Sequence, residues 1–365
     1  MIELSSRDAR RLAVTAQLLA RPRPTDLLGT ASDLAAVQVD HTAHVAPNAE
    51  LVLWSRLGGR VSRAEVEDAV TGRHLVEVRG FLRPADDVAL FTAEMAAWPG
   101  QDPPDFRAAQ ARWVQANRHA ADQLLEQLRE DGPLPARELT AGFAVDWRSS
   151  GWNDVKNVPM MLERLEEMGQ VAVSHREGRE RVWDLAERIY PDDPPVPLEE
   201  ALHERAVRRL RSLGIARTRG QACQVEPVDV GDVGAAAHVD GVRGRWRVDP
   251  QLLDTAFSGR TAIISPLDRL VVDRRRMDEL FAFDYALEMY KPAEQRIWGY
   301  FALPVLHLDR LVGKVDVQAD RRTGVLRVHA LHEDTTWSRS TRRAVGVELG
   351  SLASFLDLPV ALPAR

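Results

Sequence analysis

The chain has 365 residues, 45% of them apolar and 28% charged, which is enough for several domains with well-filled cores. Glu3 places a charge too early for a secretory signal, and no apolar run has the length of a membrane span. The single cysteine, Cys223, excludes an internal disulfide and a cysteine-based zinc finger, so we expect a cytoplasmic protein. The formal net charge of −6 is unlike that of most nucleic-acid binders, yet positive charge gathered on one surface matters more for binding than the total charge. All but three of the 48 lysine and arginine residues are arginines, which bind phosphate bidentately.

The first hundred residues contain short helices around one segment of unusual composition. Helices are predicted at 5–20, at 30–37 and from the capping box Ser62-x-x-Glu65 to Gly72, followed by a strand-like run at 74–82. After the second of these helices, Gln38-Val39-Asp40 places an amide and a carboxylate two residues apart in an otherwise apolar run. On an extended chain both side chains point to the same side, where they can hold and activate one water molecule. The proline-rich loop at 99–104 predicts the end of a first domain, residues 1–104.

Residues 105–191 show the order of elements of a winged helix. The prediction is a long helix at 106–129, a short helix that starts with residues 135–139 and another helix at 158–168, followed by two strands at 170–174 and 181–185. Arg176 and Arg179 lie in the loop that joins the strands, Arg181 begins the second strand, and Lys156 precedes the predicted recognition helix. Such a wing predicts contacts with DNA phosphates, although a solvated turn with no ligand has the same composition.

A proline-rich linker at 191–197 leads to a second winged-helix-like domain, residues 192–255. It has an Arg-rich helix at 198–213, short helices predicted from Thr218 and at 228–236, and a hairpin at 238–248 that turns at Gly241 or Gly244. In residues 256–365, β-rich runs at 297–305, 311–319 and 324–331 and a closing helix at 338–356 predict a small α+β domain with a sheet or partial barrel. The predicted fold class is therefore α+β: tandem winged-helix (helix-turn-helix) domains, with residues 1–104 as a further winged-helix-like copy, followed by a small β-rich, barrel-like C-terminal domain.

Several motifs follow one another through nearly the whole chain. They are Gln38-Val39-Asp40, Leu53-Trp54-Ser55-Arg56-Leu57-Gly58, the set Trp152, Lys156, Leu162, Glu163 and Leu165, residues 184–188, Ser265-Pro266-Leu267-Asp268, the set Arg274, Arg276, Leu280, Phe281, Phe283, Tyr285, Glu288 and Tyr290, and residues 299–304 and 313–316. In their order and spacing these motifs resemble the AlkZ/YcaQ (AlkX) family of winged-helix bacterial DNA glycosylases. Gln38-Val39-Asp40 matches the family's catalytic Gln-φ-Gln or Gln-φ-Asp motif, in which φ is aliphatic. The chain departs from the family at Pro159, where a lysine is common, and at Arg83, where AlkZ-like members have a histidine.

This resemblance implies a monofunctional DNA glycosylase in the repair of alkylation damage. Its substrate would be double-stranded DNA with alkylated purines, chiefly cationic N7-alkylguanine, including bulky adducts and interstrand crosslinks, and some members of the family confer antibiotic self-resistance on producers of alkylating compounds. Asp40 would stabilise an oxocarbenium-like sugar and accept a proton from the attacking water, which Gln38 would orient. Without the resemblance, the simpler explanation of both residues is a strand-end or helix-cap pair that bonds backbone groups.

The remaining candidates have structural explanations beside the functional ones. We predict that Trp54 and the aromatic set Phe281, Phe283, Tyr285 and Tyr290 are core residues and that Cys223 is inert. Arg56 fits either a phosphate contact or a structural role, and the same holds for the three arginines at 274–276. His41 and His44 are left out of the site, because no carboxylate or cysteine set completes a metal site with them.

The chain is thus predicted to use no metal and no other cofactor, to act as a monomer on DNA, to associate with the nucleoid in the cytoplasm and to contact no membrane. The alternative is a winged-helix transcription regulator without catalysis. A regulator would have no need of Gln38 and Asp40 but would normally need a dimerisation helix, and none is evident. A nuclease, the third possibility, would normally carry a carboxylate cluster for a metal.

Overall fold

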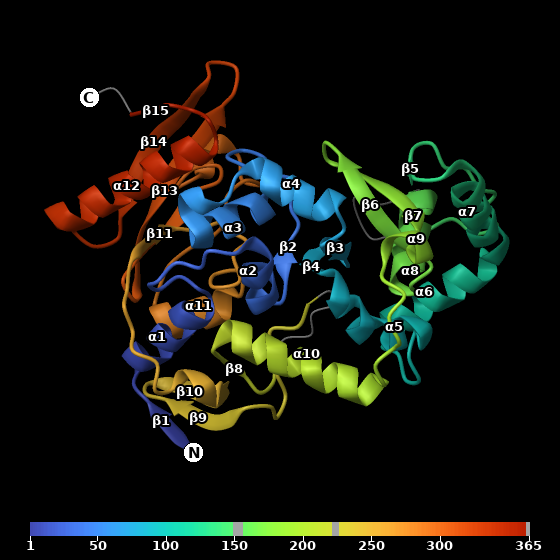
Figure 1. Cartoon of the computed structure of the whole chain (residues 1–365), viewed down its shortest axis with the longest axis horizontal. Helices are drawn as coiled ribbons and strands as arrows, with labels where there is room; N and C mark the ends of the chain where they lie inside the picture. The colour runs from blue at the N-terminus through green and yellow to red at the C-terminus, as the bar shows by residue number, and fades with distance from the viewer. Residues whose placement is uncertain (149–155, 221–225, 363–365) are drawn as a thin grey trace. The chain divides into compact units, whose positions relative to one another are not determined.

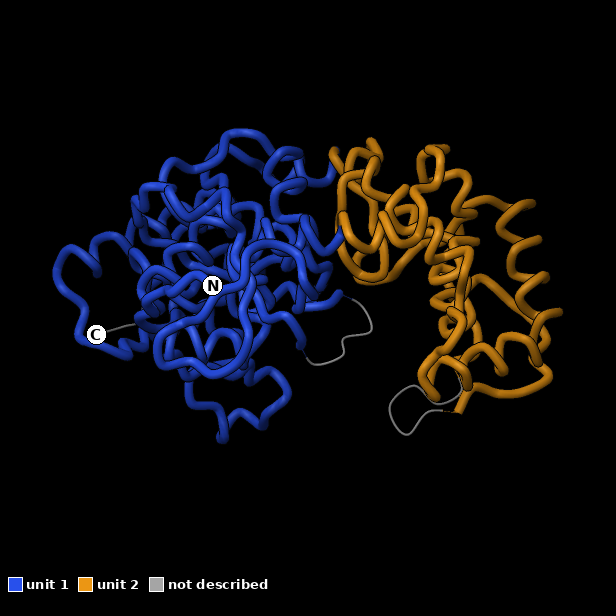
Figure 2. The backbone as a smooth tube through the Cα atoms, turned by 90° about the horizontal axis from the view of Figure 1, so that it is seen from below, with its two compact units in different colours: residues 1–68, 205–365 blue, residues 69–204 orange. Residues whose placement is uncertain are grey.

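The fold is that of a computed structural model, which describes residues 1–148, 156–220 and 226–362. It is a mixed α+β fold, as predicted, and it divides into two compact units, Met1–Asp68 with Arg205–Arg365, and Ala69–Glu204 (Figure 2). No helix within the described ranges has the length and apolar character that a membrane span requires. The finer division into four domains stays a prediction.

One sheet of the first unit joins the N-terminal strand to segments far along the chain. β1 (Ile2–Leu4) pairs in parallel with β9 (Ala235–Val239), and the sheet continues through β10 (Val242–Val248) to β8 (Ile215–Arg217) (Figure 1). α1 (Ser6–Ala16) begins where the Ser5 hydroxyl accepts a hydrogen bond from the Asp8 amide at 3.1 Å. Its buried face shares a core with Trp246 and with Leu280 of α11 (Arg274–Phe281).

A second sheet lies at the C-terminal end of the same unit, with a long helix packed on one face. Its five strands follow one another in space in chain order: β11 (Thr261–Ile263), β12 (Leu303–His307), β13 (Arg310–Asp320), β14 (Val325–Glu333) and β15 (Val360–Ala361). Val315 and Val317 of β13 share a core with Val345 and Leu349 of α12 (Arg339–Phe355). The sheet is open at β11 and β15, so the predicted β-rich C-terminal region is a half-barrel rather than a closed barrel.

The second unit carries its own sheet and a helical core. Its strands lie in the order β4 (Phe81–Pro84), β3 (Leu75–Val78), β6 (Val171–Glu177), β7 (Glu180–Leu185) and β5 (Leu134–Pro135). Its helices are α5 (Ala89–Ala96), α6 (Asp105–Ala116), α7 (Arg118–Asp131), α8 (Asn157–Glu167) and α9 (Ala186–Ile189). Trp113, Leu124, Leu162 and Trp183 join α6, α7, α8 and β7 in one core. The predicted helix at 158–168 and the hairpin after it are confirmed.

Three local predictions for this unit were wrong. The helix expected at 106–129 is interrupted at Asn117, whose side-chain oxygen accepts hydrogen bonds from the amides of Ala144 and Val145 at 2.8 and 3.0 Å. The helix expected at 135–139 is instead the two-residue strand β5 followed by a turn. The single strand expected at 74–82 is a hairpin, because Arg79 and Gly80 both take positive φ angles, of 51° and 77°, as a two-residue hairpin turn of type I′ requires.

The region expected to form the second winged helix keeps its long helix and its hairpin. α10 (Leu198–Leu213) and the β9–β10 hairpin match the prediction, and the hairpin turns at Gly241, with φ of 76°. The two short helices predicted between them are wrong for the described residues from 218 to 234, none of which is helical. Cys223 lies outside the described residues, as does Trp152.

Candidate active site

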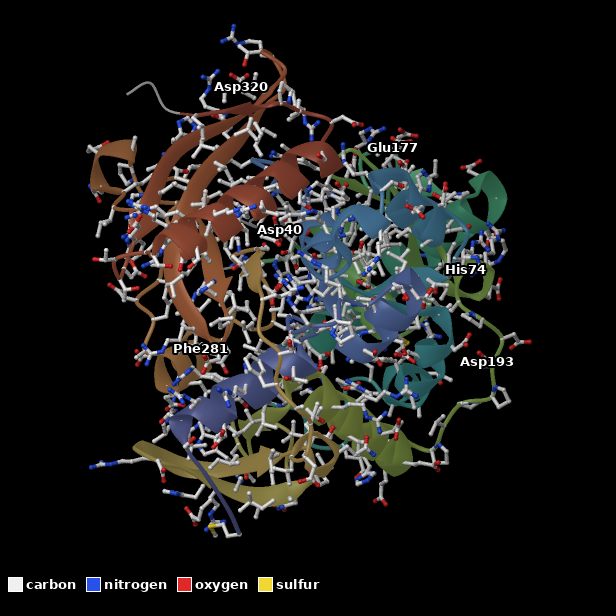
Figure 3. The ribbon with its side chains drawn as sticks, turned by 60° about the vertical axis from the view of Figure 1, so that its left-hand side comes forward. Asp40, His74, Glu177, Asp193, Phe281 and Asp320 are labelled. Atoms are coloured by element: carbon white, nitrogen blue, oxygen red, sulfur yellow. The ribbon has the colours of Figure 1, made fainter. Side chains whose placement is uncertain are left out.

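The Gln-Val-Asp segment is held in the first unit between two helices. α2 (Leu27–Leu34) is capped by Asp26 and ends at Ala35, which has a left-handed backbone. The chain then extends through β2 (Val37–Gln38), and Asp40 follows two residues later (Figure 3). Asn48, at the start of α3 (Asn48–Leu57), fixes both ends of the motif: its side-chain amide donates to the Gln38 carbonyl at 2.7 Å, and its backbone amide donates to the Asp40 carbonyl at 2.9 Å.

The side chains of the motif keep hydrogen-bonding capacity that the protein does not use. One Asp40 oxygen, Oδ1, accepts from the Thr42 amide at 2.8 Å, while Oδ2 has no hydrogen-bond partner among the described residues. Within the same ranges the side-chain amide of Gln38 is also unbonded. Both residues are half-buried rather than enclosed. An anchored backbone with a free carboxylate oxygen and a free amide can bind one water molecule and direct it at a substrate.

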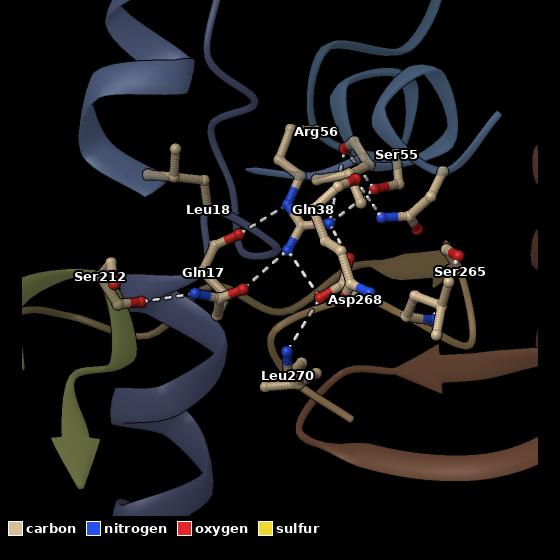
Figure 4. Close-up of polar contacts among 12 residues, drawn as sticks. Gln17, Leu18, Gln38, Ser55, Arg56, Ser212, Ser265, Asp268 and Leu270 are labelled. Atoms are coloured by element: carbon tan, nitrogen blue, oxygen red, sulfur yellow. Dashed lines mark hydrogen bonds and ion pairs between the residues drawn. The ribbon is translucent and has the colours of Figure 1, made fainter. Parts of the chain in front are cut away.

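A buried ion pair in the same unit changes the interpretation of Arg56. The Arg56 side chain is 0% exposed, and so is that of its partner Asp268 (Figure 4). Arg56 Nη1 contacts Asp268 Oδ2, and Arg56 Nη2 donates to Asp268 Oδ1 at 3.0 Å. Arg56 Nε donates to the Gln17 carbonyl at 2.9 Å. Every guanidinium nitrogen is thus bonded within the protein, so Arg56 has no surface with which to contact phosphate. Arg56 and Asp268 instead join two family motifs that are far apart in sequence.

His44 lies in the loop after the motif and packs against residues of the C-terminal region. Its ring centroid is 4.8 Å from that of Tyr300, and its carbonyl accepts from the Ala319 amide at 2.9 Å. Burial lowers the pKa of His44 to about 4, and the nearby His329 and Arg296 add to the effect. His44 therefore carries no charge at neutral pH. It brings no positive charge to the loop that follows Asp40.

The basic residues predicted to contact DNA from the second unit differ in how accessible they are. Arg176 is mostly buried and bonds both oxygens of Glu77, at 2.9 and 2.7 Å. Arg181 lies 3.9 Å from Glu77 and 3.6 Å from Glu163. By contrast, Arg179 is exposed in the two-residue turn of the β6–β7 hairpin and has no ion pair among the described residues. Lys156 is exposed directly before α8.

Most C-terminal motif residues build the fold. Arg276 is buried and donates to the carbonyls of Ile215 and Leu213 at 3.1 and 2.8 Å. Phe281, Phe283, Tyr285 and Trp54 are core residues, as predicted. The prediction was wrong for Tyr290, which is 88% exposed, because it leaves the core on a loop between the sheet strands rather than on a helix or strand.

One group of side chains in the described part of the chain has the spacing of a metal site. Glu3, His238 and Asp240 offer ligand atoms within 4.8 Å of one another, on the β1–β9 pair and the turn after it. His238 Nδ1 is 2.9 Å from Glu3 Oε2, and both side chains are largely exposed. The group lies outside the matched motifs, and nothing in it points to a role in the reaction.

A protein-family model described as DNA glycosylase AlkZ-like matches residues 31–355 of the chain. The chain belongs to the AlkZ-like DNA glycosylase family. The match begins just before the Gln-Val-Asp motif and ends with α12, so it includes both partners of the Arg56–Asp268 ion pair. Membership makes the chain an enzyme, a DNA glycosylase with DNA as its substrate, rather than a regulator without catalysis.

The fold of the AlkZ-like chain is similar to that of a solved structure, the Streptomyces sahachiroi DNA glycosylase AlkZ. The TM-score is 0.65 at 18% sequence identity, and the similarity covers 99% of this chain and 100% of the other. Since the identity is low, the likeness concerns the fold. It extends through both units and not only through the segment around Asp40.

Proposed function

We propose that this AlkZ-like glycosylase hydrolyses the N-glycosidic bond of alkylated purines, chiefly cationic N7-alkylguanine, with Asp40 and Gln38 as its catalytic residues. The observation that carries the proposal is the pair of unused groups on an anchored backbone. Asp40 Oδ2 and the Gln38 amide are unbonded within the described residues, while Asn48 fixes the chain at both positions. One Asp40 oxygen does accept from the Thr42 amide, as in a purely structural turn, but such a role leaves the second oxygen and the Gln38 amide without a purpose.

The chemistry needs little acid catalysis, because an N7-alkylated guanine is already a positively charged leaving group. As the bond to the sugar breaks, positive charge develops at the anomeric carbon, and the Asp40 carboxylate stabilises that charge. Water then adds to this carbon, and Asp40 accepts the proton that the water loses. Gln38 orients the water with its side-chain carbonyl and donates from its amide to a neighbouring oxygen. The products are the free base and an abasic site.

Hydrolysis without strand cleavage is supported by the environment of the lysines, since a lyase step needs an amine that attacks the sugar. Lys314 is 1% exposed, and its amine is bonded to both oxygens of Asp334, at 2.8 and 2.7 Å. Lys291 is paired with Glu288 at 2.9 Å. Both lysines of the unit that carries Asp40 are thus paired with a carboxylate, and the third lysine, Lys156, lies in the other unit.

We also propose that residues 105–191 act as a winged helix, with α8 as the recognition helix and the β6–β7 hairpin as the wing. Arg179 is an exposed cation in the turn of this hairpin, Lys156 is an exposed cation directly before α8, and both would contact phosphates. Arg176 and Arg181 have carboxylate partners and would brace the wing instead. Bulky adducts and interstrand crosslinks are further proposed substrates, and antibiotic self-resistance is a proposed biological role.

The test is release of N7-methylguanine from alkylated duplex DNA. Wild type should release the base, and Asp40→Asn should reduce the rate about a hundredfold to ten-thousandfold, the usual contribution of one positioned base. Asp33→Asn is the matched control, because Asp33 is an exposed carboxylate on α2, seven residues before Asp40. Failure of the wild type to release any alkylated purine would refute the proposed function. Equal rates for Asp40→Asn and Asp33→Asn would refute the assignment of the site.

A further inference from the structure

The loop at 288–298 presents two large apolar side chains to solvent in the same unit as Asp40. Tyr290 is 88% exposed and Ile297 is 68% exposed. Their neighbours Leu287 and Met289, by contrast, pack against the core that contains Trp54. Two such side chains held in water contribute nothing to the stability of the free protein, and exposed apolar groups of this kind mark a binding surface.

The loop is ordered by its own hydrogen bonds. Glu288 is 1% exposed, and its carboxylate accepts from the backbone amides of Ile297 and Trp298 at 2.7 and 2.8 Å and from the Lys291 amine at 2.9 Å. Arg296 Nε closes the loop further by donating to the Lys291 carbonyl at 2.9 Å. A buried carboxylate therefore ties the two ends of the loop together, and it fixes the backbone from which Tyr290 and Ile297 project.

Ring contacts connect this loop to the segment after the catalytic motif. The Arg296 guanidinium lies 5.0 Å from the centre of the Tyr300 ring, and that ring lies 4.8 Å from the ring of His44. Arg296 makes no ion pair within 4 Å among the described residues, although Asp316 is near enough to interact with it electrostatically, and its partly exposed guanidinium can reach a phosphate. The loop thus combines an aromatic ring, a branched aliphatic side chain and a cation beside the chain that follows Asp40.

We infer that Tyr290 and Ile297 form a wedge that stacks against the bases next to the lesion and opens the duplex there, with Arg296 on the adjacent phosphate. Aliphatic side chains inserted at base steps are a common way to unstack DNA, and aromatic rings stack on any base irrespective of sequence. The occupant of the surface is the base stack of duplex DNA, to which the charge of Arg296 is complementary. The inference rests on the proposed function, because it gives the wedge a place in the excision of the lesion.

Tyr290→Ala tests the wedge, with Tyr290→Phe as the conservative variant and Val347→Ala as the matched control. Val347 is 63% exposed on α12 in the same unit, so its removal changes exposed apolar area away from the loop. Tyr290→Ala should reduce excision from duplex DNA roughly fivefold to a hundredfold, the range expected for loss of one stacking contact. The loss should be far smaller on the same lesion in a single strand, where no stack has to be opened. Tyr290→Phe should retain the wild-type rate on both substrates.

A second measurement separates this inference from the reaction itself. Asp40→Asn protein should increase the fluorescence of a 2-aminopurine placed beside the lesion, because the wedge unstacks that base, and the double variant Asp40→Asn/Tyr290→Ala should not. If wild type releases no alkylated base but the signal appears and depends on Tyr290, the proposed function fails and the wedge stands. The wedge is overturned if Tyr290→Ala and Ile297→Ala behave like Val347→Ala on duplex DNA, or if the loss is equal on duplex and single strand. A change in oligomeric state with unchanged DNA readouts would also overturn it, by assigning the pair to a second copy of the chain.

Discussion

Replacing Arg56 by alanine should unfold the first unit far more easily without touching the DNA interface directly. The side chains of Arg56 and Asp268 are both 0% exposed, so the variant leaves a buried carboxylate without its countercharge. Breaking a buried pair in this way typically costs about 3–5 kcal/mol of unfolding free energy. Asp268 Oδ1 still accepts from the Leu270 amide at 2.9 Å, which places the expected loss toward the lower end of that range.

The neighbours of the pair sharpen the expectation. Arg56 also bonds the Gln17 carbonyl and side-chain oxygen, at 2.9 and 3.0 Å, and these acceptors lose their donors in the variant. Asp268→Asn should cost less than Arg56→Ala, because an asparagine oxygen can still accept from Arg56 and from the Leu270 amide. The double variant Arg56→Met/Asp268→Leu should recover part of the loss, since an apolar pair of similar volume removes both buried charges, while Gln17 stays unsatisfied.

Urea unfolding of each variant, followed by tryptophan fluorescence, measures these losses. For a unit of this size a loss of 3–5 kcal/mol corresponds to a fall of roughly 6–20 °C in melting temperature. DNA binding is then compared well below the transition, where the slope of log K against log salt counts phosphate contacts. Arg56→Ala should keep the wild-type slope. Wild-type stability together with a slope reduced by about one phosphate would refute the buried ion pair and assign Arg56 to a DNA contact.

Three further predictions follow from ionisable groups. Arg179→Ala should lower the slope of log K for DNA binding against log salt by about one phosphate contact, whereas Arg176→Ala should leave that slope unchanged because Arg176 is bonded to Glu77. Binding titrations at several salt concentrations measure both slopes. Equal effects of the two variants would contradict the assignment of Arg179 to a phosphate and of Arg176 to Glu77. Burial and the neighbouring Glu77 raise the pKa of Glu166 to about 7, so the native state holds this proton more tightly than the unfolded chain does, and Glu166 lowers the stability of the protein as pH rises from about 4.5 to about 7. Glu166→Gln should therefore be more stable than wild type at pH 8, by at most about 3 kcal/mol. Urea unfolding should show this gain at pH 8 and no difference near pH 4. Burial lowers the pKa of His44 to about 4, so the effect of pH on stability is the reverse of that of Glu166: stability is lost as pH falls from about 6.5 toward 4. His44→Gln should flatten this part of the profile of unfolding free energy against pH. An unaltered profile would refute the lowered pKa of His44.

The sequence predicted best those features that depend on neighbours in the chain. The capping box at Ser62 is present, with Glu65 accepting from the Ser62 amide at 2.7 Å and the Ser62 hydroxyl accepting from the Glu65 amide at 3.2 Å. The helix at 157–167 and the hairpin after it also follow from local signals, namely an apolar stripe, a glycine past the helix end and a short turn. The Gln-Val-Asp motif was singled out by its residue types and spacing, and its role in the reaction stays a proposal.

Features set by distant contacts were missed. Nothing near Arg56 in the sequence shows that its countercharge is Asp268, 212 residues away, so a motif match could not separate a buried ion pair from a phosphate contact. Asn117 divides one predicted helix in two by bonding the amides of Ala144 and Val145, again through a tertiary contact. Tyr290 follows an apolar aromatic series, but the buried Glu288 turns the chain into a loop and leaves the ring in solvent.

The net negative charge of the chain and its binding of DNA are reconciled by where the arginines lie. Arg56 and Arg276 are buried, and Arg176 is neutralised by Glu77, so none of them adds free positive charge to the surface. An arginine in such a place is selected for its fork of donors, which joins segments distant in sequence, and not for attraction to phosphate. Phosphate contacts are then left to exposed cations such as Arg179, which has no ion pair among the described residues. If the lesion is the proposed cationic N7-alkylguanine, recognition can depend more on the Asp40 carboxylate and on stacking than on attraction to the DNA backbone.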